Sequence, residues 1–280
     1  MIVSPKYDDF VKEMFRNETI RRYFLGDILG ISQKKIRSVK LRNTFLRKRY
    51  RRQKLGILDI LLELNNDEKI NIELQVKFVK NWDKRQLFYL TRLYGEDLLI
   101  GENYDRLKKC IGISILDFNL TDRRTYHSVY RLRDKEGYEF SDILELHVIE
   151  LKKELTGQGE VDDWIRFFNV EKEEDLRMIR TKNPGILEAI GALKRMSMSN
   201  PVRLRYEDYL KRVRDEKARE DYVREQGVAE GEEKGERLLA QLMEHLFSDN
   251  RLEDAKLAAS DEKARKRFFK EYGLDKRSNR

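Results

Sequence analysis

Asp59, Glu73 and Gln75 are the side chains whose types and spacing point most directly to chemistry. They lie in residues 56–64 and 70–78, where apolar and polar residues alternate with a period of two, as in a β-strand with one buried face. The five residues between these segments are polar, so the pair is predicted to form a β-hairpin. Its hydrophobic pattern sets Asp59 opposite Glu73, with Gln75 two residues further along the same face.

The apolar residues fix this register, because a slip of one residue would move every side chain to the other face. One face should be buried and the other polar. The predicted partners are Leu62 with Ile70, Ile60 with Ile72, Leu58 with Leu74, and Glu63 with Lys69.

Directly opposed carboxylates destabilise a hairpin unless something lies between them. With Cβ atoms roughly 4.5–5.5 Å apart, Asp59 and Glu73 would leave room for one hard cation. Magnesium takes oxygen ligands at about 2.0–2.1 Å and accepts one or two carboxylates together with waters and substrate phosphate. The alternative is a solvated polar face on which both carboxylates point into water.

The same residues resemble a known family. Asp59 followed by Glu73-Leu74-Gln75 resembles the PD-(D/E)XK nuclease motif in its E-x-Q form. Other segments are similar, in order and spacing, to the PD-(D/E)XK nuclease family transposases, the recombination-promoting nuclease group. These segments are residues 8–15 (with Val11 at a Phe position), 84–94, 101–104, 113–118, 164–168, and the series Gly227, Gly231 and Gly235.

The resemblance implies an α/β fold with a restriction-endonuclease-like core, a mixed sheet flanked by helices, followed by a helical C-terminal region. It also implies a DNA endonuclease that uses Mg (or Mn), with Asp59, Glu73 and the Leu74 carbonyl holding the ion. Most such enzymes have Lys where this chain has Gln75, which can hydrogen bond to a water or a phosphate oxygen but brings no charge. Asp8 is a possible additional acid, or simply a favourable charge in the first turn of a helix.

Basic residues are concentrated just before Asp59. The net charge of the chain is +8, whereas residues 31–58 contain eleven Lys or Arg and no acid. Lys and Arg on phosphates supply most sequence-independent affinity for DNA, and Phe45 and Tyr50 could stack on bases. A solvated basic loop is the alternative. The predicted DNA contacts are Arg47, Lys48, Arg49, Arg51 and Arg52.

A helix over residues 83–99 should follow the hairpin. Arg85, Tyr89, Arg92 and Glu96 would line one side of it, opposite Leu87, Leu90 and Leu98. Arg85 and Tyr89 on that side are predicted to contact nucleic acid; the alternative is an ordinary solvent face.

The remaining pattern predicts a helix over residues 6–29, a weak strand at 36–41, and strands at 110–118, 126–133 and 144–152. We therefore expect a nuclease-like domain over 1–155 and a helical region over 156–280. Asn183-Pro184 and Asn200-Pro201 are good helix starts.

Two apolar stripes, residues 206–213 and 238–246, could pair the C-terminal helices in a homodimer. Packing within one chain explains them equally well.

Composition excludes several classes. There is one Cys, so no disulfide framework can form within the chain, and the three His show no zinc-ligand spacing. No apolar run approaches 18 residues and no secretory h-region is visible, so we expect no membrane association and a cytoplasmic, nucleoid-associated protein. Two other functions stay open: a nucleic-acid-binding protein without catalysis, and a protein-interaction scaffold built on the helices of residues 200–280.

Overall fold

The computed structural model describes residues 2–46, 56–96, 98–155, 157 and 159–274. The predicted DNA contacts Arg47, Lys48, Arg49, Arg51 and Arg52 lie outside the described residues. The elements up to the last sheet strand are α1 (Asp8–Met14), α2 (Glu18–Leu29), the short 3₁₀ turn Gln33–Lys35, β1 (Val39–Arg42), β2 (Phe45–Leu46), β3 (Gly56–Ile57), β4 (Ile60–Leu64), β5 (Glu68–Gln75), α3 (Trp82–Tyr94), the 3₁₀ turn Tyr104–Arg106, β6 (Cys110–Leu116), β7 (His127–Arg133) and β8 (Glu139–Glu150). The helices that follow are α4 (Glu160–Phe168), α5 (Glu173–Met178), α6 (Pro184–Met198), α7 (Asn200–Ser248), α8 (Leu252–Ser260) and α9 (Glu262–Glu271).

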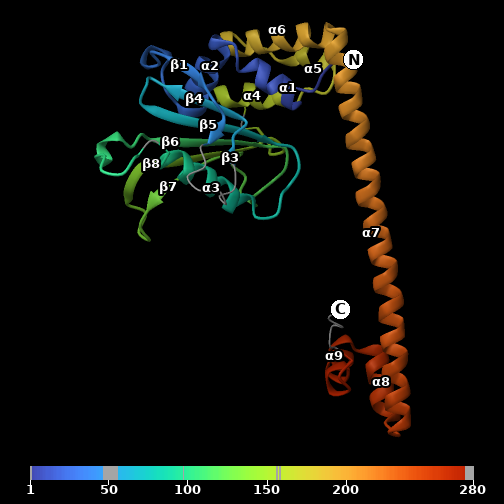
Figure 1. The fold of residues 1–280 in the computed structure, drawn as a ribbon. Helices are drawn as coiled ribbons and strands as arrows, with labels where there is room; N and C mark the ends of the chain where they lie inside the picture. Colours follow the sequence, from blue (N-terminus) through green and yellow to red (C-terminus); the bar gives the residue numbers. More distant parts are fainter. Residues whose placement is uncertain (1, 47–55, 97, 156, 158, 275–280) are drawn as a thin grey trace. The chain divides into compact units, whose positions relative to one another are not determined.

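The main sheet is mixed, as the fold prediction requires. Its strand order is β1-β4-β5-β6-β8-β7. The pairs β1–β4, β4–β5 and β7–β8 are antiparallel, whereas β5–β6 and β6–β8 are parallel. Helices α1, α2, α4 and α6 lie on one side of the sheet and α3 lies on the other (Figure 1). The predicted α/β class with a flanked mixed sheet is confirmed.

The β4–β5 hairpin has the predicted register. Ile60 pairs with Ile72, Leu62 with Ile70, and Glu63 with Lys69. The chain reverses through Asn65 and Asn66, which have φ angles of 55° and 63°. Asparagine tolerates this left-handed conformation, and two such residues in succession match the twist of a hairpin.

Both faces of the hairpin are buried, where the sequence pattern predicted one. Leu61, Asn71 and Glu73 point away from the Ile60 and Ile72 face, yet they are 7%, 3% and 3% exposed. The reason is the parallel pairing of β5 with β6, which places β5 inside the sheet with helices over both faces. Glu73 is therefore a buried carboxylate and not a surface one.

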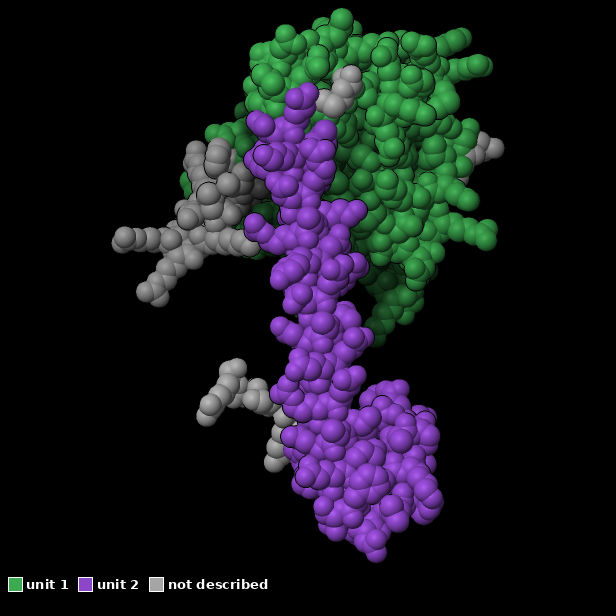
Figure 2. All heavy atoms as spheres, turned by 90° about the vertical axis from the view of Figure 1, so that its right-hand side faces the viewer, with its two compact units in different colours: residues 1–206 green, residues 207–280 purple. Residues whose placement is uncertain are grey.

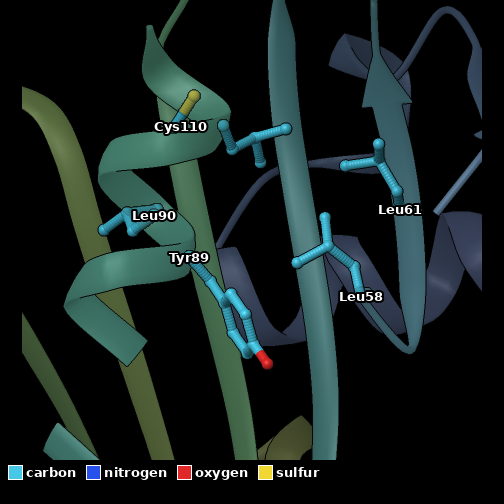
Figure 3. Packing of buried hydrophobic residues seen from close by; sticks show 6 residues of the cluster. Leu58, Leu61, Tyr89, Leu90 and Cys110 are labelled. Carbon is cyan, nitrogen blue, oxygen red and sulfur yellow. The ribbon is translucent and has the colours of Figure 1, made fainter. Parts of the chain in front are cut away.

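Helix α3 packs on the sheet with a different side from the one predicted. Tyr89, Leu90 and Leu93 are buried, whereas Leu87 is 55% exposed. Figure 3 shows Tyr89 and Leu90 extending from α3 toward the strands. The helix ends at Tyr94 and not near residue 99. The cluster beneath it contains Leu58, Leu61, Tyr89, Leu90, Leu93 and Cys110.

Leu58 is a correction to the predicted hairpin. It was expected to share a face with Ile60 and Leu62, but it packs in the cluster beneath α3 with Leu61. Asp59 forms a bend and β4 begins only at Ile60, so the strict alternation of a strand does not extend back to Leu58.

The predicted helix over residues 6–29 is two helices. Asn17 begins α2 by accepting a hydrogen bond from the Ile20 amide at 3.2 Å. The Arg21 guanidinium donates to the carbonyls of Phe15 and Arg16 at 2.8 Å each. These bonds satisfy backbone groups that a continuous helix would have paired internally. The predicted end of the helix at Gly30 is confirmed, with φ of 66°.

Contacts divide the chain into two compact units, residues 1–206 and 207–280 (Figure 2). A partly buried carboxylate joins α4 and α6 to α2: Trp164 Nε1 and Asn183 Nδ2 both donate to Asp27 Oδ2 of α2 at 2.6 Å. Asn183 also begins α6, as predicted. The predicted boundary at 155/156 concerns where the nuclease-like domain ends, and it stays a prediction.

The second unit has its own small core. Leu242 and Leu246 of α7 are fully buried against α8 and α9, together with Ala255, Ala258 and Phe268. The 238–246 stripe thus packs within its own chain, and the homodimer through these helices stays a prediction. Among the residues that the structure describes, none of the helices has the length and apolarity needed to span a bilayer.

The packing of α3 can be tested with a matched pair of leucines. Leu93→Ala should lower the free energy of unfolding by about 2–5 kcal/mol, because Leu93 is fully buried. Leu87→Ala, on the exposed side of the same helix, should change it by less than about 0.5 kcal/mol. Urea unfolding followed by circular dichroism measures both. Equal losses would show that α3 does not cover the sheet with the Leu93 side.

Candidate active site

Asp59 lies directly before β4, within reach of charges from three other elements. It forms the bend that leads into β4 at Ile60, whose partner in β5 is Ile72, the residue before Glu73. Its charge also interacts with Asp8 and Lys12 of α1 and with Arg85 of α3. Of the residues predicted to take part in chemistry, Glu73 and Asp8 are thus the two whose negative charges act on Asp59.

Glu73 is held in place by neutral donors. Gln86 Nε2 of α3 donates to Glu73 Oε2 at 2.7 Å, and Asn71 Nδ2 donates to Oε1 at 3.2 Å. Gln86 is oriented in turn by Ser114 Oγ of β6, which donates to its Oε1 at 3.3 Å. Arg85 Nη2 lies 3.8 Å from Glu73 Oε2. These partners fix the orientation of the buried Glu73 carboxylate.

The surroundings of Asp59 disfavour its charged form. Burial, together with the negative charges of Glu73 and Asp8, raises the pKa of Asp59 to about 6, although Lys12 and Arg85 act in the opposite direction. The two carboxylates therefore repel each other in the way that the hairpin register predicts.

The donors at this point fit a hard divalent cation. Asp59 and Glu73 offer carboxylate oxygens, and the unfavourable charge on Asp59 is what a cation would relieve. In the described part of the chain, no group of three or more His, Cys, Asp or Glu side chains is arranged to hold an ion. The protein would thus supply two carboxylates and the Leu74 carbonyl, and waters and phosphate would complete the shell, as magnesium accepts.

Gln75 is the last residue of β5 and lies two residues past Glu73, so strand alternation places it on the Glu73 face. It is partly buried. Its carbonyl accepts a hydrogen bond from the Asp117 amide at 3.0 Å, which anchors the end of the strand. Leu74 lies between Glu73 and Gln75 and pairs with Ile115 of β6.

Arg85 and Tyr89, the two residues of α3 that are predicted to contact nucleic acid, differ in their exposure. Arg85 is partly exposed and its guanidinium lies 5.4 Å from the centre of the Tyr89 ring. Tyr89 itself is only 8% exposed, because α3 turns this ring toward the sheet. Tyr89 therefore supports Arg85, and we withdraw it as a direct contact to nucleic acid.

Several residues of this site were missed from sequence. The contacts of Gln86 and Asn71 with Glu73 follow from the packing of α3 over β5, which the local sequence does not indicate. Lys12 had a weak signal, because it follows Asp8 by one helical turn; the pair is bonded at 2.6 Å.

A mixed sheet covered on both faces, with two carboxylates brought together at the open end of a hairpin, defines an α/β protein of restriction-endonuclease-like layout. Within that class the chain belongs to the PD-(D/E)XK nuclease family transposases, whose family model matches residues 6–223. This confirms the resemblance found in the sequence and supports a nuclease-like function. No curated protein and no solved structure matches the chain.

The raised pKa of Asp59 makes a prediction about pH. In metal-free protein the folded chain holds the Asp59 proton more tightly than the unfolded chain does, since the pKa rises from 3.8 to about 6. The resulting stability is present below about pH 4 and is lost as the pH rises through about 6. Asp59→Asn should therefore be more stable than wild type by about 1–3 kcal/mol at pH 7, with the difference vanishing near pH 4.

Thermal melts in EDTA between pH 4 and 8 measure this difference. Asp67→Asn, at an exposed position in the turn of the same hairpin, is the control and should show no such trend. A difference that stays constant with pH would contradict the crowding of Asp59 by Glu73.

Proposed function

We propose that this protein is a metal-dependent DNA endonuclease that hydrolyses phosphodiester bonds with Mg²⁺ or Mn²⁺. The observation that carries the proposal is the meeting of Asp59 with the buried, hydrogen-bonded Glu73 at the end of the β4–β5 hairpin. The chain also belongs to a family of nucleases, and this membership supports the same reaction class. Promotion of recombination is the role that the family resemblance suggests for such cleavage.

Asp59, Glu73 and the Leu74 carbonyl would hold the ion. When bound, such an ion polarises the phosphate and lowers the pKa of a bound water. Gln86 and Asn71 keep the Glu73 oxygens oriented, which fixes where the charge of this carboxylate acts. Gln75 has an amide that can hydrogen bond to the attacking water or to a phosphate oxygen. Arg85, which reaches the same carboxylate from α3, can position the DNA backbone.

DNA affinity would come chiefly from the basic segment of residues 31–58. The eleven positive charges of this segment directly precede Asp59 in the sequence. The residues that would bind the DNA backbone are therefore close along the chain to the proposed cleavage residue. Arg42 is the described member nearest the hairpin core, where it pairs with Glu63 at 3.0 Å.

Removal of the metal-binding carboxylate tests the reaction. Asp59→Ala should abolish Mg²⁺-dependent nicking of supercoiled plasmid, because one of two protein carboxylates is lost, while DNA binding stays within about twofold. Asp67→Ala, in the turn of the same hairpin, should cleave like wild type. Nicking by Asp59→Ala at the wild-type rate would refute the assignment. DNA binding by wild type without calorimetric binding of Mg²⁺ or Mn²⁺ would favour a binding protein without catalysis.

The basic segment makes a separate prediction about salt. Replacing Arg47, Lys48, Arg49, Arg51 and Arg52 with Ser should flatten the dependence of log affinity on log salt by several units, since each phosphate contact contributes about 0.9. Fluorescence anisotropy with a DNA duplex between 50 and 200 mM salt measures the slope, a range over which 6–10 contacts would cost roughly 10³–10⁵ in affinity.

The matched control removes five charges from the exposed part of α7: Lys211, Arg212, Arg214, Lys217 and Arg219, each to Ser. This variant should keep most of the wild-type slope. If both variants lose the same slope, DNA binding depends on total charge and not on the segment beside Asp59.

A further inference from the structure

One helix of the second unit carries charge of a single sign on its exposed side. Helix α9 packs with α8 against the end of α7 (Figure 1), and its buried residues Ala264 and Phe268 join the small core of this unit. The exposed basic residues of α9 recur at the spacing i, i+3, i+4 and i+7, so they share one face of the helix. We call this the basic face: Lys263, Lys266, Arg267 and Lys270.

Hydrogen bonds at both sides of the α8–α9 junction fix the orientation of this face. Asp261 Oδ1 accepts from the Ala264 amide at 2.7 Å and begins α9. Arg265, on another side of the helix, donates to two carbonyls in the last turn of α8 at 2.8 and 2.9 Å. Rotation of α9 would break these bonds and would expose Phe268, which is 1% exposed. The basic face is therefore held toward solvent.

The two acids of α9 neutralise this face only in part. Glu271 is engaged by Arg251 Nη1 at 2.5 Å. Glu262 pairs with Lys266 at 2.5 Å, but the two side chains are 73% and 70% exposed. Water screens such a pair and it contributes little, so a phosphate can replace Glu262 at small cost.

The exposed part of α7 differs, because several of its basic residues are paired with acids on the same helix. Arg224 pairs with Asp221 at 3.4 Å, and Arg237 pairs with Glu233 at 2.7 Å. Pairs at i, i+3 and i, i+4 spacing are typical of a solvated helix surface and cancel its charge locally. A face with four bases in about two turns instead attracts polyanions.

Two kinds of polyanionic surface could meet such a face, a nucleic acid and an anionic membrane. A helix that binds at a membrane interface needs a free apolar side to enter the lipid. The apolar side of α9 is already used, because Ala264 and Phe268 are buried in the core of the unit and Phe269 packs against it. The helix can therefore offer a partner little besides its charges, which is how proteins contact the DNA backbone.

We propose that the basic face of α9 binds the phosphate backbone of duplex DNA, as a second DNA-binding surface in addition to residues 31–58. The inference rests on the proposed nuclease function for the identity of its ligand. Neutralising phosphates releases counterions, so the contact raises affinity without reading the base sequence. From Lys263 to Lys270 the face spans about 10 Å along the helix, since each residue rises about 1.5 Å. That distance corresponds to about three base pairs.

Removal of the four charges in the full chain tests the proposal. Changing Lys263, Lys266, Arg267 and Lys270 to Gln keeps good helix formers in α9. In EDTA, this variant should flatten the dependence of log affinity on log salt by about two to four units, since each phosphate contact contributes about 0.9. Fluorescence anisotropy with a duplex of about 20 base pairs between 50 and 200 mM salt measures the slope. Exchanging Lys and Arg at the same four positions should keep the wild-type slope, because the charge is retained.

The matched control removes four charges from exposed positions elsewhere in the second unit: Arg224, Lys234, Arg237 and Lys256, each to Gln. Three of these residues pair with acids on their own helices, so the slope should change by less than about one unit. Circular dichroism should show the same helix content in both variants. A smaller variant, Lys263→Gln with Lys270→Gln, should flatten the slope by about one to two units if the fourfold variant does not fold.

The outcomes separate this surface from the nuclease function. If wild type binds duplex DNA and never cleaves it, the nuclease function fails, and a flattened slope in the α9 variant still supports the surface. If wild type cleaves but the α9 variant keeps the wild-type slope, or loses no more than the control, only the α9 surface is refuted. Binding of wild type to phosphatidylglycerol vesicles that the α9 variant loses, with its DNA slope unchanged, would make the face a membrane surface and overturn the proposal. If wild type binds no DNA at all, both proposals fail.

Discussion

Electrostatic repulsion between Asp59 and Glu73 is the constraint around which this part of the molecule is organised. Asp59 precedes Ile60, whose partner Ile72 precedes Glu73, and helices on both faces of the sheet exclude much of the water that would screen the two charges. The groups around Glu73 differ from those around Asp59. Glu73 receives two neutral hydrogen bonds and one cation, whereas Asp59 has charges of both signs around it and a raised pKa. Hydrogen bonds thereby fix the orientation of Glu73, whereas the ionised form of Asp59 is disfavoured.

The different surroundings of Glu73 and Asp59 depend on α3. The helix covers the sheet with Tyr89, Leu90 and Leu93, and the same packing delivers Gln86 to Glu73. Hydrophobic burial and polar orientation thus come from one element, since the side that fills the core also carries the donor. Arg85, one residue before Gln86, reaches the edge of the site for the same reason.

The hairpin was predictable from sequence because its signals are local. Alternation over residues 56–64 and 70–78 sets the register, and the asparagines of the turn accept left-handed angles. The same holds for the start of α6 at Asn183. The prediction failed where side-chain hydrogen bonds or a bend overrode the hydrophobic pattern. Arg21 and Asn17 divide the first helix, and the bend at Asp59 turns Leu58 into the cluster beneath α3.

The candidate site itself stays a prediction, and its residues differ in how far the sequence indicates them. Asp59, Glu73 and Gln75 follow from periodicity and resemblance, because they lie on one hairpin. Gln86 comes from an element that follows the hairpin, and its hydrogen bond to Glu73 depends on how α3 docks on the sheet. The exposure of Tyr89 was predicted wrongly for the same reason, since a helical stripe of mixed character does not indicate which side meets the core.

The position of Asp59 also bears on how such a protein evolves. A carboxylate that is pressed against Glu73 and partly buried opposes folding whenever no cation is present. Drift under selection for stability alone would replace it, because most exchanges of the charge for a neutral group would relieve the repulsion. Lineages that no longer need the chemistry should therefore lose Asp59 early and keep the hairpin, the turn asparagines and the α3 core. Retention of Asp59 among descendants of the chain would then indicate that the chemistry proposed for it is still under selection.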